Sequence, residues 1–255
     1  MDTNSIKMKS DPKKADSMHR EQLDFIIPMY NPPQGWSAVL IERLHPIIEK
    51  TNHLVKVILV NDGSNNGNVV PEIDILSKQG YEIKLVQYTQ NQGKGYALRQ
   101  GVQQSSGKYL VLTDIDIPFT EESMWAILRS LEVNKADLAL GQRDDSYYEH
   151  IPNSRKRMSK WLSIVNSRIF RLPVKDTQCG LKGLNRKGKE IFLQTTIKRY
   201  LFDLEMVFLA SKKKDIRIDP VPVILRHGIQ LSSMRLKVIL PELMNFFKIV
   251  IKHWI

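Results

Sequence analysis

The sequence contains almost no cysteine. Cys179 is the single cysteine among 255 residues, so no disulfide can form within the chain, as is usual for proteins of a reducing compartment. Glycine and proline are sparse too, at 13 and 12 residues, which excludes collagen-like and low-complexity chains. A chain of this length with 42% hydrophobic residues can bury enough surface to fold without covalent cross-links.

Long apolar runs are missing as well. Nowhere do about 18 apolar residues follow one another, the length that a membrane-spanning helix needs. Residues 1–22 are polar and lack the apolar stretch of a secretion signal, so we expect a disordered tail there. These absences, together with the lone cysteine, predict a cytoplasmic protein.

Three familiar cofactor-binding patterns are absent. The chain has no G-x-x-x-x-G-K-[ST] loop, and no G-x-G-x-x-G follows the first apolar run. These gaps argue against a P-loop enzyme and a dinucleotide-binding enzyme. Six histidines are scattered without H-x-x-x-H or H-E-x-x-H spacing, so we expect no zinc site.

Acidic residues are outnumbered by basic ones. Lys and Arg total 38 against 27 Asp and Glu, a net charge of +11. Such a surplus favours a polyanionic partner: phosphate, nucleic acid or an anionic membrane face. A basic cluster at residues 155–160 supports a nucleic-acid-binding domain as one hypothesis, but the chain has no RNP, zinc-finger or helix-turn-helix pattern. We therefore expect no specific nucleic-acid partner.

Short apolar runs alternate with helix-like segments along the first half of the chain. This alternation predicts an α/β fold, with a mostly parallel sheet covered by helices on both faces. Later residues are less regular, with a glycine-containing loop at 176–183, a helical run from Phe202 and two proline-flanked strands within 216–225. One domain over residues 23–233 accounts for all of them. The expected strands of the first half are residues 23–28, 55–60, 81–88, 108–114 and 136–141.

Residues 234–255 have the periodicity of an amphipathic helix. Two interpretations stay open, docking onto the domain or lying in a membrane interface. In either case Glu242, Asn245, Lys248 and Lys252 fall largely on the polar side. The apolar residues at helical spacing are Ile239, Leu243, Phe246, Phe247, Val250 and Trp254.

Carboxylates and a lysine follow several of the expected strands. Asp114 and Asp116 are one residue apart, and two such acids repel each other unless a cation lies nearby. Their oxygens suit Mg²⁺ or Mn²⁺ bridging nucleotide phosphates, although a solvated strand end is the alternative. Asp62 is either part of an ordinary turn or an acceptor for a nucleotide base. Lys94 enters a helix within Gln-Gly-Lys-Gly, where backbone N–H groups can meet phosphate.

The order of these motifs is more specific than any one of them. It resembles the family 2 glycosyltransferases of the GT-A fold, and within them the dolichyl- and undecaprenyl-phosphate mannose and glucose synthases. The similarity spans about residues 23–233. The motifs that carry it lie at residues 28–31, 60–64, 91–95, 114–116, 141–143 and 176–180.

The resemblance implies how a nucleotide-sugar donor is held. Asp62 would read the base of a UDP- or GDP-hexose. Asp114 and Asp116 would bind Mg²⁺ or Mn²⁺, with Asp116 the more direct ligand. The implied donor-binding residues are Pro28, Tyr30, Asn31, Asp62, Lys94 and Asp114.

The resemblance also implies an inverting, metal-dependent transfer of a hexose to a polyprenyl phosphate, with peripheral contact at the inner face of the membrane. A phosphate acceptor is already an anion and needs no base. A saccharide hydroxyl, as in cell-surface polysaccharide synthesis, is the alternative acceptor and needs one, for which Asp203 is the candidate. With Asp116 and Asp203, Arg143 completes the expected catalytic group. The implied acceptor or phosphate ligands are Arg143, Arg155, Lys156, Ser159, Gln178 and Lys182.

Overall fold

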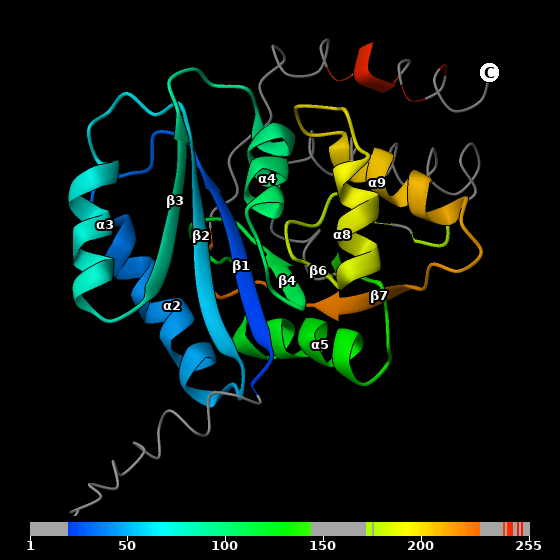
Figure 1. Ribbon diagram of the computed structural model, residues 1–255, viewed down its shortest axis with the longest axis horizontal. Coiled ribbons are helices and arrows are strands. Elements are labelled where there is room, and N and C mark those ends of the chain that lie inside the picture. The colour runs from blue at the N-terminus through cyan, green and yellow to red at the C-terminus, as the bar shows by residue number, and fades with distance from the viewer. Residues whose placement is uncertain are drawn as a thin grey trace, which may run out of the picture.

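A central sheet of seven strands organises the part of the chain that the computed structural model describes, residues 20–143, 172–174, 176–229, 242, 244–246, 249 and 251. Its strand order is β3-β2-β1-β4-β6-β5-β7 (Figure 1). The strands are β1 (Gln22–Met29), β2 (Leu54–Asp62), β3 (Glu82–Tyr88), β4 (Tyr109–Leu112), β5 (Leu138–Arg143), β6 (Lys182–Leu184) and β7 (Ile218–Val223).

Helices cover both faces of this sheet, as the alternation of segments predicts. One face packs against α2 (Trp36–Lys50), α3 (Val69–Lys78) and α5 (Glu121–Glu132). The other packs against α4 (Lys94–Gln103), α8 (Arg186–Leu193) and α9 (Phe202–Ser211) (Figure 1).

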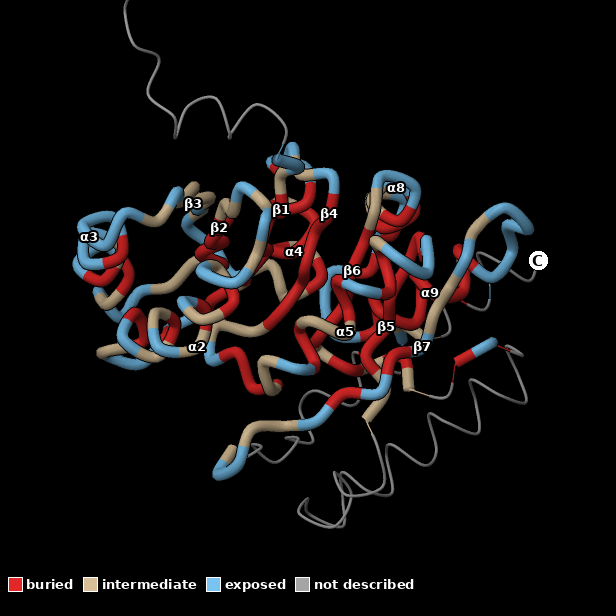
Figure 2. The backbone as a smooth tube through the Cα atoms, turned by 90° about the horizontal axis from the view of Figure 1, so that it is seen from below, coloured by how far each residue is buried: buried red, intermediate tan, exposed pale blue. Residues whose placement is uncertain are grey.

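Two hydrophobic cores result, one on each side of the sheet. In β1, Phe25 and Ile27 face the α2 side, whereas Ile26 faces the α4 side, because successive side chains of a strand point to opposite faces. All three are fully buried, and the central strands lie in the buried middle of the molecule (Figure 2). Burial on both faces explains why these strands are continuously apolar.

The mostly parallel sheet is confirmed, with one reversal. β6 pairs antiparallel with both β4 and β5, so the loop expected at residues 176–183 was wrong from Lys182 onward. Only one strand, β7, forms where two were expected within residues 216–225; Leu225 adds an isolated bridge to Phe119. β7 lies at the sheet edge, where its prolines remove no ladder hydrogen bond.

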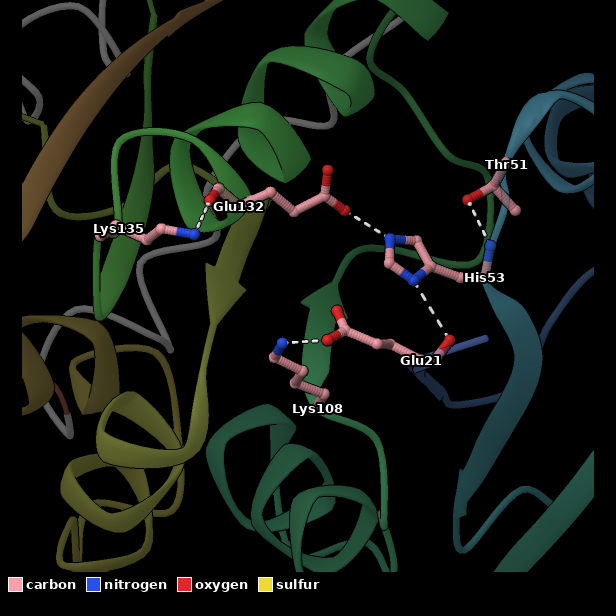
Figure 3. Close-up of polar contacts among 6 residues, drawn as sticks. All are labelled: Glu21, Thr51, His53, Lys108, Glu132 and Lys135. Atoms are coloured by element: carbon pink, nitrogen blue, oxygen red, sulfur yellow. Dashed lines mark hydrogen bonds and ion pairs between the residues drawn. The ribbon is translucent and has the colours of Figure 1, made fainter. Parts of the chain in front are cut away.

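Polar contacts connect the amino ends of β1, β2 and β4, at the end of the sheet where these strands begin (Figure 3). The ring of His53 is central: Nδ1 lies 3.1 Å from the backbone oxygen of Glu21, and Nε2 contacts the Glu132 carboxylate at the end of α5. Lys108 forms an ion pair with the side chain of Glu21. These contacts join strand starts and one helix end, so we assign this edge a structural role.

Three described residues of the C-terminal segment (residues 234–255) pack against the domain. Glu242 and Ile249 are 9% and 1% exposed, and Phe246 packs against the core on the α4 side. Glu242, expected on the polar side of this helix, is buried, and its carboxylate accepts hydrogen bonds from the backbone N–H groups of Tyr200 and Leu201. Met244 and Ile251 are each 59% exposed. No helix among the described residues is long and apolar enough to cross a membrane.

Candidate functional site

The carboxyl ends of the parallel strands carry the predicted polar residues, as expected for an open α/β sheet. Asp62 ends β2, and Asp114 and Asp116 follow β4 directly. Lys94 begins α4, and Asp203 lies in the first turn of α9. Ion pairs connect these elements across the sheet edge, from Lys94 to Asp114 at 2.5 Å and from Lys182 to Asp203 at 2.9 Å.

Asp62 organises the loop that leads into α4. The backbone N–H groups of Gln92 and Gly93 donate to its two carboxylate oxygens at 2.8 and 2.9 Å, and Asn91 Nδ2 donates at 2.8 Å. Asp62 is buried, so it is more than a solvated turn residue. The hydroxyl of Tyr88 lies near it, and burial and then the Asp62 carboxylate raise the pKa of that phenol.

Lys94 and Asp114 form the centre of the site. Burial disfavours the charged amine, but the carboxylate of Asp114 outweighs this and raises the pKa of Lys94 above its usual value. A Cβ atom on Gly180 would lie 2.7 Å from Asp114 Oδ2. Only glycine at position 180 therefore leaves room for the Asp114 carboxylate beside the loop that precedes β6.

Asp116 is exposed and lies in the turn that follows β4, two residues after Asp114. Desolvation raises the pKa of its carboxyl, and the negative charge of Asp114 raises it further. Arg43, from α2, donates to the backbone oxygen of Asp116. The next residue, Ile117, has φ +35°, a strained conformation for a β-branched side chain. The Arg43 contact thus braces a strained turn.

Asp114 and Asp116 would supply some, but not all, of the ligands that a divalent cation needs. Desolvation raises the pKa of the Asp116 carboxyl and repulsion by Asp114 adds to it; a bound cation relieves repulsion of this kind. No group of three or more His, Cys, Asp or Glu side chains that could hold a metal occurs among the described residues. Asp114 and Asp116 would therefore supply two ligands, and substrate phosphates and water the remainder, as is usual for Mg²⁺.

Asp203 and Lys182 form a buried pair behind this centre. Burial raises the pKa of Asp203 to about 6, although Lys182 and then Lys94 favour its charged form. Lys182 also donates to the backbone oxygen of Cys179. Both side chains are less than a tenth exposed. Asp203 is poised to change its protonation state near neutral pH, which suits a proton acceptor.

Arg143 is held by Asp176 rather than pointing freely into the site. Its Nε and Nη2 donate to the two carboxylate oxygens at 2.6 and 2.8 Å, and this pairing outweighs burial to lower the pKa of Asp176. Gln178 has a buried Nε2 without a hydrogen-bond partner in the described structure. Burial raises the pKa of the Cys179 thiol to about 11, so it is unreactive.

Three residues predicted for donor binding lie at the end of β1. Pro28 is within β1, and Tyr30 just beyond it is 53% exposed. Asn31 joins the two loops: its N–H donates to Ser64 Oγ at 2.8 Å, and its Oδ1 accepts the N–H of Asn65 at 2.9 Å. Arg155, Lys156 and Ser159 lie outside the described residues.

Sequence reasoning missed the cationic and aromatic residues at positions 198–200. Lys198 Nζ donates to Gln92 Oε1 at 3.0 Å, and the Lys198 backbone oxygen accepts the N–H of Tyr96 at 3.0 Å. A Cβ on Gly93 would lie 2.7 Å from that oxygen. The Lys-Arg-Tyr sequence follows no strand, so its place beside the α4 loop had no local signal. Arg43 was missed for the same reason.

Residues 24–192 match the family described as Glycosyl transferase family 2. This range covers well over half of the chain and runs from within β1 to within α8. The chain belongs to glycosyl transferase family 2. The glycosyltransferase assignment and the family resemblance are thereby confirmed.

Curated relatives of this glycosyltransferase are known from several eukaryotes. It is 29% identical over 238 residues to a dolichyl-phosphate beta-glucosyltransferase of Drosophila melanogaster, covering 84% of this chain and 70% of the relative. It is 28% identical over 235 residues to the Saccharomyces cerevisiae protein of the same name, covering 85% and 70%.

Solved structures confirm the GT-A fold. Glucosyl-3-phosphoglycerate synthase from Mycobacterium tuberculosis, in complex with Mn²⁺, UDP-glucose and phosphoglyceric acid, superposes with a TM-score of 0.59. The alignment covers 88% of this glycosyltransferase and 76% of that chain at 14% identity. At this identity the likeness shows the fold alone.

Proposed function

We propose that this glycosyltransferase moves a hexose from a nucleoside diphosphate sugar to a polyprenyl phosphate, with inversion at the anomeric carbon. The observation that carries the proposal is the Asp114–Lys94 pair beside Asp116, where β4 ends and α4 begins. A helix N-terminus and a lysine favour a diphosphate. The names of the Drosophila and yeast relatives support dolichyl phosphate as acceptor.

In this reaction an acceptor phosphate oxygen bonds to the anomeric carbon as the bond to the diphosphate breaks on the opposite side. The sugar passes through an oxocarbenium-like state, as in other glycosyl transfer. Lys94 holds a positive charge next to the leaving nucleoside diphosphate. Mg²⁺ or Mn²⁺, held by Asp114 and Asp116, would supply further neutralisation of that leaving group. Asp62 orders the loop whose backbone lies beside the donor.

The acceptor phosphate needs cations of its own. Two lysines are candidates: Lys182, which pairs with Asp203, and Lys198, which contacts the loop before α4. Gln178 offers an amide nitrogen that has no hydrogen-bond partner in the described structure. Arg143 is paired with Asp176 and so contributes positive charge to the site from a fixed position. The roles of Arg155, Lys156 and Ser159 as phosphate ligands stay predictions. A saccharide hydroxyl remains the alternative acceptor, since Asp203 has a pKa suited to a base. Nucleic-acid binding has only the net charge and the basic cluster at residues 155–160 in its favour.

Membrane contact is part of the same proposal. A polyprenyl phosphate resides in a bilayer, and the net charge of +11 attracts an anionic membrane face by about 1 kcal/mol per basic residue near the surface. Met244 and Ile251 are both helical and exposed, and their spacing of seven positions would place them on one face of the amphipathic helix that the sequence predicts here. That face supplies the apolar contact.

The test is a transfer assay with the full chain. Radiolabelled UDP-glucose and GDP-mannose are each offered with undecaprenyl phosphate or a soluble oligosaccharide, with and without Mn²⁺. We expect transfer to the lipid phosphate from one donor. Asp116→Ala should reduce the rate by about 10²–10³, as losing a charge-stabilising group does.

Asp74→Ala is the matched control, because Asp74 is exposed on α3 and should leave the rate unchanged. Transfer to the oligosaccharide alone would refute the lipid-phosphate acceptor. A folded chain that transfers from neither donor would refute hexosyl transfer from these nucleotides.

A further inference from the structure

The carboxylate of Glu242 caps a helix that lies forty residues earlier in the chain. Glu242 Oε2 accepts the N–H of Leu201 at 3.0 Å, and Oε1 accepts that of Tyr200 at 3.5 Å. Arg199 Nε lies 3.8 Å from the same Oε1. α9 begins at Phe202 and has no side-chain cap of its own at Leu201. Glu242 therefore accepts the N–H of the N-cap residue, which a helix start leaves without a partner, and that of the residue before it.

The capped turn belongs to the site. Asp203, two residues after Leu201, pairs with Lys182 at 2.9 Å, and its charge also acts on Lys94. Phe202 packs on the α4 loop so closely that a Cβ on Gly95 would lie 2.8 Å from its own Cβ. A shift of this turn would therefore move Asp203, and it would also move Phe202, which packs against the residue next to Lys94.

Other contacts hold the preceding loop but come from elements of the site itself. Glu205, in α9, accepts the N–H groups of Thr196 and Ile197 at 2.7 and 2.8 Å. Arg99, in α4, donates to the oxygen of Ile197 at 2.7 Å. Glu242, in contrast, comes from the C-terminal segment and accepts hydrogen bonds from the N–H groups of residues 200 and 201. Its segment is anchored by Ile249, which is 1% exposed.

We propose that Glu242 is a positioning residue for the transfer reaction: it ties the C-terminal segment to the first turn of α9 and thereby holds Asp203 and Lys94 in place. The proposal rests on the proposed function for its effect on rate. Through Glu242, the C-terminal segment takes part in the reaction in addition to any contact with the membrane. Glu242 touches neither Asp203 nor Lys94 and acts only through the α9 turn.

The experiment compares Glu242→Ala, Glu242→Gln and the wild type as full chains. Glu190→Ala is the control, since Glu190 forms an exposed pair with Arg186 on α8. Hydrogen exchange is followed in peptides covering residues 196–206 and, as reference, residues 22–29 of β1. Steady-state transfer from the donor that the wild type uses gives kcat and KM, and thermal unfolding gives Tm.

We expect Glu242→Ala to speed exchange in residues 196–206 and not in β1. Its kcat should fall about tenfold, in line with the loss of hydrogen bonds to a charged group, while the donor KM changes little. Glu242→Gln should recover part of kcat, because its amide oxygen still accepts an N–H. Glu190→Ala should match the wild type.

Two results would overturn the proposal. Unchanged exchange in residues 196–206 would show that Glu242 does not hold the turn. Faster exchange throughout, with kcat lost only in proportion to the unfolded fraction, would show a purely structural residue. An inactive wild type would instead refute the proposed function, and the exchange data would still decide whether Glu242 orders the α9 turn.

Discussion

At the scale of single residues, environment decides which acid does what. Asp116, Asp176 and Asp203 have the same side chain, yet their pKa values move in different directions. Desolvation and then Asp114 raise that of Asp116. The Arg143 fork outweighs burial and lowers that of Asp176, whereas burial raises that of Asp203 to about 6. Of these three acids, Asp203 is the one that combines a pKa near neutrality with a buried position close enough to act on the charge of Lys94.

Asp203→Asn separates the two possible acceptors. Asp203 is protonated below pH about 6, so a base at this position loses its function as the pH falls through that value. For a phosphate acceptor no base is required, and we expect the variant to keep its rate within about tenfold, because it loses only the attraction to Lys182 and Lys94. The rate is measured as a function of pH in both proteins.

A different result would favour the saccharide hydroxyl. A loss of about 10²–10⁴ in rate is typical when a general base is removed. The wild-type rate would then fall below pH about 6, and the variant would lack that dependence. Circular dichroism and Tm must accompany the rates, since removing one partner of a buried pair also destabilises a fold by about 3–5 kcal/mol.

At the scale of elements, the sheet edge is assembled from helices and loops far apart in sequence. The β-strands and α5 follow from local pattern, and Thr120 caps α5 by accepting the N–H of Ser123, as its hydroxyl predicts. α8 has the same kind of cap, because Asn185 Oδ1 accepts the N–H of Gly188, and sequence reasoning missed it. β6 has no comparable signal. β6 is only three residues long, and its antiparallel direction depends on both neighbours, β4 and β5.

Arg43→Met tests the link between α2 and the turn after β4. Methionine keeps an apolar stem but removes the donor to the Asp116 oxygen, so the strained turn at Ile117 loses its brace. We expect the KM for Mn²⁺ and the nucleotide sugar to rise about tenfold, as loss of one hydrogen bond and a nearby charge suggests. The Tm should change little because Arg43 is partly exposed.

Arg43→Lys serves as the control for charge. A lysine should restore part of the affinity for the sugar diphosphate and less of the turn geometry, because it lacks the planar fork. An unchanged KM in Arg43→Met, with normal folding, would contradict the brace. The measurement is a steady-state titration of Mn²⁺ and donor in each variant.

At the scale of the whole molecule, the basic surplus and the C-terminal segment act on the same partner. We expect the full chain to sediment with vesicles of phosphatidylcholine and phosphatidylglycerol at low salt. Met244→Ser with Ile251→Ser should weaken that binding at least tenfold, because burying each apolar side chain is worth roughly 1.5–3 kcal/mol. Sedimentation should also decrease as salt screens the charges.

The double substitution is preferable to deleting the segment. Deletion would also remove Glu242 and Ile249, which are buried against the domain, and would confuse loss of binding with damage to α9. Val70→Ser with Ile75→Ser is the matched control, since both side chains are exposed on α3. Equal sedimentation of the Met244/Ile251 variant and the wild type would contradict the proposed apolar contact.

The sequence by itself determined the parallel α/β sheet, the two apolar layers and the carboxylates at the strand ends, because strand period and strand termini are local properties. Only the tertiary structure decided which of those groups meet. The pairing of Lys94 with Asp114, of Lys182 with Asp203, and of Glu242 with the start of α9 joins residues 20 to 41 positions apart. Such contacts depend on how the elements pack, which no local pattern records.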